Sequence, residues 1–166
     1  LPDNVQVGNE IIGGMLWNNG RVGGTYDTSV QWANLGRLLN AAIQGVREAS
    51  GSQQPQIMIH IDRGGDWAAT QWFFDKLNQQ AVPFDLIGQS YYPCSHGDLG
   101  ALHTCLTNTA RRYGKPVVIA ETAFPWANAS AIYGIPATTN GQVEFVAALA
   151  RAIKTLPGDL GAGMGP

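Results

Sequence analysis

Short apolar segments alternate with amphipathic stretches four times along the chain, and this alternation constrains the fold more than any other feature of the sequence. The apolar segments occupy residues 5–10, 57–61, 86–92 and 117–121. After each segment, apolar residues recur at three- and four-residue steps, which is the spacing of an amphipathic helix. Such an order is typical of a parallel α/β fold, and periodicity alone leaves open whether the sheet is a small open one or half of a barrel.

Polar residues mark the starts of the predicted helices. The first helix is expected to begin near Thr28, and Asp66 is a candidate N-cap for the second. The third should begin at about Asp98, and the fourth contains residues 143–153. Because the strand–helix order repeats without a break, the chain is expected to form a single domain.

Polar or aromatic residues stand at the end of every predicted strand. In parallel α/β folds, ligands bind at the carboxyl ends of the strands, where loops rather than packing choose the residues. The residues expected to share this rim are Glu10, His60, Asp62, Tyr91, Tyr92 and Glu121. The sequence therefore predicts the functional site at this edge of the sheet.

Glu10 and Glu121 form a candidate catalytic pair on that rim. Glycosidic cleavage requires two carboxyl groups, one to protonate the leaving oxygen and one to attack the anomeric carbon, and a separation of ~5–5.5 Å gives retention. The pKa values of the two groups must also be pushed apart. Asn9 and a strand-end tyrosine are suitable hydrogen-bond donors to keep one carboxylate ionised.

Aromatic residues beside the carboxylates suit a sugar site, because their flat faces can cover the C–H face of a pyranose. The candidates are Trp17, Tyr91, Tyr92 and Trp126. We expect half of them to be packing residues instead. Core packing is also predicted for three tryptophans on or beside helices: Trp32, Trp67 and Trp72.

His60 has two interpretations. It is either a partly buried imidazole bonded to the backbone or, two residues before Asp62 at a strand end, a group that hydrogen-bonds a sugar hydroxyl. Asp62 has the same second interpretation. His96 and His103 are interpreted as ordinary surface or capping residues.

Charge and hydropathy argue against two classes of partner. The net charge is −2, and the few lysines and arginines are scattered, so nucleic acid is not an expected partner. A membrane is not expected either, because uninterrupted apolar runs of ~18 residues are missing from the sequence.

Metal, phosphate and serine-hydrolase motifs are also missing from the sequence. The segment between Cys94 and Cys105 lacks metal-ligand spacing, and two unrelated thiols are favoured over a disulfide. The glycines of residues 13–24 fit no phosphate-binding pattern and are interpreted as loop geometry. Ser90 lacks the G-x-S-x-G context of a nucleophilic serine.

Five motifs occur in the order and spacing of the endo-β-1,4-galactanases, which form glycoside hydrolase family 53. They are VQVGNEI (5–11), GMLW (14–17), HIDRG (60–64), SYYP (90–93) and ETAFPW (121–126). The chain resembles this family over nearly its whole length. The resemblance implies that residues 1–166 supply strands four to seven of a (β/α)8 TIM barrel, as one partial domain truncated at both ends.

The resemblance also implies roles for individual residues. Glu10 is expected to be the general acid/base and Glu121 the nucleophile, with Asn9 bonded to the 2-hydroxyl of the sugar. A tyrosine at the end of the third predicted strand should bond the nucleophile, and both Tyr91 and Tyr92 remain open for that role. Trp126 resembles the substrate-loop tryptophan of the family.

The chain departs from the family pattern in two loops and at its ends. Trp17 is followed by Asn18 and Asn19 where proline is usual, and the segment 93–96 replaces a more aromatic one. The strand-eight motif of the family is missing where the chain stops. Some members bind a structural calcium, but the loop after Trp126 has no acidic residue before Glu144, so no metal or other cofactor is expected.

The function implied is retaining, endo-acting hydrolysis of β-1,4-galactan in the arabinogalactan side chains of pectin. A polymeric substrate implies secretion. The expected partners are the galactan chain and the missing N-terminal half of the barrel. Two alternatives stay open: another barrel glycosidase of the same clan, such as a β-mannanase or cellulase, and a half-barrel that is inactive because its edge strands and inner face are exposed.

Overall fold

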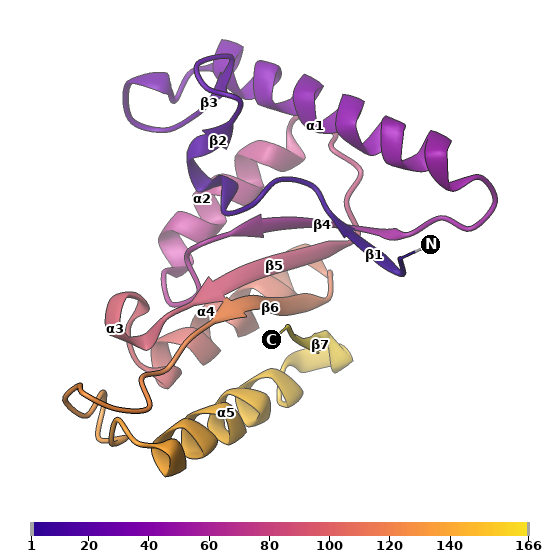
Figure 1. The fold of residues 1–166 in the computed structure, drawn as a ribbon. Helices are drawn as coiled ribbons and strands as arrows, with labels where there is room; N and C mark the ends of the chain where they lie inside the picture. The colour runs from indigo at the N-terminus through magenta and orange to yellow at the C-terminus, as the bar shows by residue number, and fades with distance from the viewer. Residues whose placement is uncertain (1, 166) are drawn as a thin grey trace.

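The computed structural model describes residues 2–165 and contains a five-stranded parallel sheet (Figure 1). Every neighbouring pair of strands in this sheet is parallel. The strands, in spatial order, are β1 (Asn4–Gln6), β4 (Gln56–Ile61), β5 (Leu86–Tyr91), β6 (Val117–Thr122) and β7 (Gly161–Met164). Their spatial order is also their order along the chain, which is the arrangement of a partial (β/α)8 barrel.

Four long helices connect these strands: α1 (Ser29–Ser50), α2 (Trp67–Asn78), α4 (Leu99–Tyr113) and α5 (Thr139–Lys154). They follow one another from top to bottom along one side of the sheet in Figure 1. Right-handed crossovers between adjacent parallel strands place all connecting helices on the same side. Each helix begins at a side-chain oxygen that accepts a backbone N–H, and these N-caps are Thr28, Asp66, Asp98 and Thr138.

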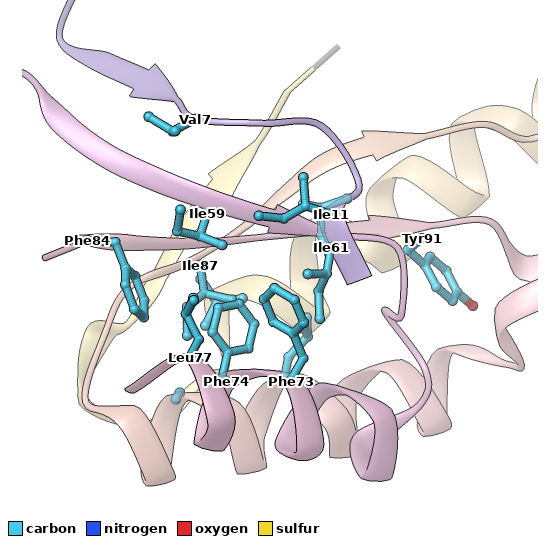
Figure 2. Close-up of a cluster of buried hydrophobic side chains, with 14 of the residues drawn as sticks. Val7, Ile11, Ile59, Ile61, Phe73, Phe74, Leu77, Phe84, Ile87 and Tyr91 are labelled. Atoms are coloured by element: carbon cyan, nitrogen blue, oxygen red, sulfur yellow. The ribbon is translucent and has the colours of Figure 1, made fainter. Parts of the chain in front are cut away.

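The core lies between the sheet and its helices. Phe73, Phe74 and Leu77 of α2 point toward Ile59 and Ile87 of the sheet, and all five are fully buried (Figure 2). The rings of Phe73 and Phe74 pack edge to face with centroids 5.3 Å apart. The apolar residues predicted for α2 therefore face the core, whereas Val143 and Val146 of α5 are exposed.

The tryptophans on or beside helices also contribute to packing. Trp32 is 1% exposed and packs edge to face on Trp72, with ring centroids 5.3 Å apart. Asp27 accepts the indole N–H of both rings, at 2.7 and 3.1 Å. Core packing is thereby confirmed for these two, whereas Trp67 is half-buried at the start of α2.

The strand β7 extends the predicted four strands by a fifth. Its sequence, Gly161 to Met164, lacks an apolar run, and one of its two glycines is required where α5 ends. A Cβ at Gly161 would lie 2.0 Å from the carbonyl oxygen of Ile153. Close packing of the helix end thus excludes a side chain at Gly161, the first residue of the strand.

The first predicted strand, residues 5–10, is shorter than expected, since β1 ends at Gln6. The glycine-rich segment that follows contains the hairpin of β2 (Gly14–Met15) and β3 (Gly20–Arg21). Short helical turns complete the described structure: η1 (Ile11–Gly13), η2 (Gly24–Tyr26), α3 (Pro93–His96) and η3 (Pro157–Asp159). Elements of two to four residues are too short to carry a period.

Cys94 is exposed, Cys105 is buried, and both thiols are free, as favoured by the sequence. Among the helices of residues 2–165, none has the length and apolarity needed to cross a membrane.

Candidate active site

An irregularity in the pairing of β5 with β6 decides which way Glu121 faces. Gln89 pairs with Ile119, but the next residue, Ser90, pairs with Glu121 instead of Ala120. The extra residue shifts the alternation of side chains by one position, as a β-bulge does. Without this shift, Glu121 would share the face of Ile119, which lies in the apolar core. With it, Glu121 faces the same side of the sheet as Ser90.

Glu10 lies in a turn beyond the end of β1. Its φ of 50° is in the left-handed region, and it is the N-cap residue of η1. The next residue, Ile11, is 2% exposed and belongs to the apolar core, so it anchors the turn. A non-glycine residue in this backbone region costs energy, and such residues cluster at functional sites. The turn places the Glu10 carboxyl beside His60 of β4.

The structure brings Glu10, His60 and Glu121 together. One carboxylate oxygen of each glutamate and a ring nitrogen of His60 all lie within 4.8 Å of one another. The three residues come from the end of β1, from β4 and from β6. The two carboxyl groups therefore approach each other at the carboxyl ends of the strands.

Tyr92 contacts the second carboxylate directly. Its hydroxyl donates to Glu121 Oε2 at 2.9 Å. That hydrogen bond is the main reason why the pKa of Tyr92 rises to about 12, with burial and the charges of Glu121 and Glu10 adding to it. Tyr92 therefore joins the end of β5 to the carboxylate on β6.

Tyr91 points to the opposite side of the sheet. It is 0% exposed, its ring stacks on Phe145 of α5 at 6.2 Å, and its hydroxyl donates to the carbonyl oxygen of Gly97. Burial raises its pKa above the usual range. Figure 2 shows it pointing away from the other labelled side chains of the cluster. The sequence left both tyrosines open, and alternation along β5 removes Tyr91 from the rim and directs Tyr92 to it.

Glu10 is linked to His60 through Ser90. The Ser90 hydroxyl donates to Glu10 Oε1 at 2.7 Å, and its Oγ lies 2.8 Å from His60 Nε2. The other ring nitrogen of His60, Nδ1, lies 3.2 Å from Asn9 Oδ1. His60 is therefore neither bonded to the backbone nor free to take a sugar hydroxyl, because both of its nitrogens contact neighbouring side chains.

The environment of His60 acts on its pKa in two directions. Burial is the largest influence and lowers the pKa, since His60 is 0% exposed. The negative charges of Glu121, Glu10 and Asp62 oppose this effect, and the net change is downward. His60 is therefore neutral at neutral pH. A cation that used His60 as a ligand would have to displace Ser90 or Asn9 from a ring nitrogen.

Asp62 lies just beyond the end of β4, half-buried. Its Oδ2 accepts from Arg63 Nη1 at 2.6 Å. Its Oδ1 is buried and has no hydrogen-bond partner within residues 2–165. A buried carboxylate oxygen without a partner is costly, so Oδ1 is available to a donor such as a sugar hydroxyl.

The two candidate tryptophans are both largely exposed. Trp126 is 65% exposed in the loop after β6, and Trp17 is 62% exposed between β2 and β3. The Trp17 indole donates to the carbonyl oxygen of Gly13, and the guanidinium of Arg21 lies 4.3 Å from its ring centroid. Both loops lie at the end of the sheet to which the arrows of β4, β5 and β6 point in Figure 1.

Sequence reasoning missed Ser90 and Gln6. Ser90 was considered only as a nucleophile, whereas it bridges Glu10 and His60; its position two residues before Tyr92 places it on the same face of the strand. Gln6 donates to Asn9 Oδ1 at 2.9 Å. No periodicity identifies Gln6, because its contact depends on the turn after β1.

The sheet, the carboxylate pair at its strand ends and the helices on one side define half of a (β/α)8 barrel of the glycosidase type. A sequence model of glycosyl hydrolase family 53 matches residues 1–165, and the chain belongs to this family.

Relatives of known sequence support the assignment. The chain is 44% identical to an uncharacterized protein of Niallia circulans, covering 98% of this chain and 48% of that protein. It is 33% identical to an arabinogalactan endo-β-1,4-galactanase of Thermothelomyces thermophilus, covering 96% and 50%. It is 37% identical to a probable arabinogalactan endo-β-1,4-galactanase A of Aspergillus fumigatus, covering 95% and 46%. The chain thus spans about half the length of these relatives.

Solved structures show the same fold. A structure from a study of two fungal β-1,4-galactanases superposes with a TM-score of 0.84 at 32% identity, covering 98% of this chain and 50% of that one. The catalytic domain of a family 53 protein from Ignisphaera aggregans superposes with a TM-score of 0.85 at 30% identity, covering 99% and 47%. The prediction of a partial TIM barrel is confirmed by these superpositions.

Proposed function

We propose that this chain supplies both catalytic carboxylates of a secreted, retaining endo-β-1,4-galactanase that acts on galactan side chains of pectin. The observation that carries the proposal is the approach of Glu10 and Glu121 to within 4.8 Å at the carboxyl ends of parallel strands. The galactanases among the relatives support the choice of galactan as substrate. Secretion follows from a polymeric substrate outside the cell.

In the first step, Glu121 attacks the anomeric carbon while Glu10 protonates the leaving oxygen, so the C–O bond breaks and a galactosyl ester of Glu121 forms. In the second step, Glu10 removes a proton from water, which attacks the same carbon and releases Glu121. The hydrogen bond from Tyr92 supports the assignment of Glu121 as the nucleophile, because it stabilises the negative charge. Glu10 has a hydroxyl neighbour in Ser90 instead of a phenol.

Four residues are proposed to bind sugar around this pair. Asn9 uses Oδ1 to accept from Gln6, which leaves its Nδ2 to donate to the 2-hydroxyl. Asp62 offers Oδ1 to another hydroxyl. Trp17 and Trp126 present exposed rings on which pyranose faces can stack.

Reducing-sugar release from β-1,4-galactan by the complete protein tests this function, with Glu10→Gln and Glu121→Gln variants beside it. We expect galactan cleavage by the wild type and its loss in both variants. Mannan and cellulose serve as control polymers, because barrel glycosidases of the same clan that cleave them would use an equivalent pair of glutamates. Cleavage of mannan or cellulose without cleavage of galactan would contradict the proposed substrate.

We also propose that residues 1–166 alone are inactive. The strands β1 and β7 each pair on one side only within the described residues, and an unpaired parallel edge promotes association. Size-exclusion chromatography and the galactan assay on the isolated chain test this point. A monomeric and active isolated chain would contradict it.

A further inference from the structure

The ring of Trp17 is held by its own loop although the side chain is 62% exposed. Its indole N–H donates to the carbonyl oxygen of Gly13 at 2.9 Å. A Cβ at Gly13 would lie 3.2 Å from Cζ2 of the ring, so the edge of the ring packs directly on that backbone. The guanidinium carbon of Arg21 lies 4.3 Å from the ring centroid. Trp17 is therefore an exposed aromatic residue whose edge and one face are already in contact.

Arg21 joins Trp17 to a second aromatic ring. Its guanidinium carbon also lies 4.3 Å from the ring centroid of Tyr26, a half-buried residue at the end of η2. Cations within ~6 Å of an aromatic face are attracted to it. Within residues 2–165, no carboxylate lies at ion-pair distance from Arg21. The guanidinium is therefore held by two rings instead of a counter-ion, and we call Trp17, Arg21 and Tyr26 the Arg21 cluster.

The backbone on which Arg21 lies is fixed as well. Arg21 belongs to β3 and pairs with Gly14 of β2. Gln31, at the start of α1, donates from Nε2 to the carbonyl oxygens of Arg21 at 2.8 Å and of Asn18 at 3.1 Å. Figure 1 shows this hairpin beside the first turns of α1. The hairpin is thereby attached to the longest helix of the described structure, which limits its movement.

The cluster is also connected to the turn that carries Glu10. Gly13, the acceptor of the indole N–H, is the last residue of η1, and Glu10 is the N-cap residue of the same turn. The carbonyl oxygen of Gly13 accepts a second hydrogen bond from the backbone N–H of Val22, at 3.0 Å. The position of the Trp17 ring is therefore defined relative to the catalytic turn.

An aromatic ring that is ordered in advance binds more tightly than a mobile one. A side chain that becomes immobile on binding loses rotamer freedom, and this loss reduces the affinity. The contacts with Arg21 and Gly13 restrict Trp17 before any ligand arrives. The face turned away from Arg21 stays open, and a flat apolar face of this kind can cover the C–H face of a pyranose.

We propose that Arg21 is a positioning residue for substrate binding, which together with Tyr26 holds the Trp17 ring as a preordered surface for one sugar unit of the polymer. This inference rests on the proposed galactanase function and adds how one of its sugar contacts is built. Arg21 acts through Trp17 and not on the reacting bond. Its loss weakens the ground state and the transition state equally, so KM rises while kcat is retained.

Nitrogen-15 relaxation of the tryptophan indole N–H groups in the complete protein tests the positioning without any substrate. The Trp17→Phe variant identifies the signal of Trp17. We expect a wild-type order parameter for Trp17 close to that of the buried Trp32, and a value below about 0.6 in Arg21→Ala. Tyr26→Leu should lower it too, whereas Tyr26→Phe retains the ring and should retain the value. A Trp17 that is already mobile in the wild type, or unchanged in Arg21→Ala, would overturn the proposal.

Steady-state kinetics on β-1,4-galactan provide the second measurement. Arg21→Ala should raise KM about three- to tenfold at constant kcat, the size of one or two exposed cation–ring contacts. Lys115→Ala is the matched control, because it removes another cation–ring contact, 4.5 Å from Phe84 at the start of the strands instead of their ends. An equal rise of KM in Lys115→Ala, or a loss of kcat at constant KM in Arg21→Ala, would contradict the positioning role.

A double variant decides whether Arg21 acts through Trp17. The KM of Trp17→Ala/Arg21→Ala should equal that of Trp17→Ala alone, because Arg21 then has no ring to hold. A further rise in the double variant would mean that Arg21 binds sugar directly, which would overturn the proposal. A wild type that cleaves no galactan would remove the proposed function, but the relaxation measurement would still decide whether Arg21 orders Trp17.

Discussion

The two faces of the parallel sheet place different physical requirements on the residues that they carry. Toward the helices lie Ile59, Tyr91 and Ile119, which are buried in an apolar core. Toward the other side lie His60 and Ser90, equally buried but joined by a hydrogen bond. On the helix face, shape and volume decide stability, whereas on the other face every hydrogen must find an acceptor. Substitutions on the first face should affect unfolding, and those on the second should affect catalysis.

The largest effect is expected on the polar face. In the complete protein, Glu121→Ala should lower kcat on galactan by on the order of 10⁴-fold, because the nucleophile is lost. Its free energy of unfolding should change by less than about 1 kcal/mol. Steady-state kinetics and urea unfolding measure the two quantities. Glu144→Ala on α5 is the control, since Glu144 is exposed and lies outside the cluster. An equal loss of kcat in Glu144→Ala would contradict the specific role of Glu121.

The apolar face is tested at Tyr91. Tyr91→Ala should lower the free energy of unfolding by roughly 3–5 kcal/mol, because it empties a fully buried site that contacts Phe145. Tyr91→Phe loses only the hydrogen bond to Gly97 and should cost about 1 kcal/mol. Urea unfolding gives both values. If Tyr91→Phe abolished activity while leaving stability intact, the assignment of this residue to packing would be wrong.

Tyr92 provides the matched substitution on the other face. Tyr92→Phe removes the hydrogen bond to the Glu121 carboxylate and should lower kcat roughly ten- to one-hundred-fold. Its stability should stay within about 0.5 kcal/mol of the wild type, because Tyr92 is only half-buried. Reversed behaviour of the two tyrosine-to-phenylalanine variants would break the comparison of faces.

The smallest effect is expected at the helix ends. Asp66→Ala removes the side-chain oxygen that accepts the Ala69 N–H at the start of α2 and should cost about 1 kcal/mol of stability. Galactan cleavage should be unaffected below the melting temperature. Asp66→Ser retains an N-cap and is the control. Thermal melting of both variants decides the point, and equal losses in the two would show that the cap is not responsible.

The sequence predicted the repeated strands and helices because their signals are local. The N-caps at Thr28, Asp66 and Asp98 begin helices where the sequence placed them. The fifth strand could not be predicted in this way, because Gly161 is selected by the close approach of α5 and carries no apolar signal. Apolar periodicity and capping residues identify elements of five or more residues. They do not identify a glycine whose presence is determined by close packing.

The candidate site also has one part that the sequence predicted and another part that it did not. The sequence placed Glu10, His60 and Glu121 at one edge of the sheet because each lies at the end of a predicted strand. In the structure, one carboxylate oxygen of each glutamate and a ring nitrogen of His60 lie within 4.8 Å of one another. The bulge that turns Glu121 to the polar face lies in the pairing of two strands, and one strand read alone does not reveal it. The bridge through Ser90 likewise joins residues far apart in the sequence. Contacts of this kind can be identified only from the pairing of the strands in three dimensions.

The most direct test of the central claim is to identify the residue that bonds covalently to the sugar. The complete protein is treated with a 2-deoxy-2-fluoro-β-1,4-galactobioside carrying a dinitrophenyl leaving group, and the labelled peptide is sequenced by mass spectrometry. The account requires a galactobiosyl ester on Glu121, formed with loss of activity. A label on Glu10, or full cleavage of galactan by a protein that never forms the ester, would contradict it.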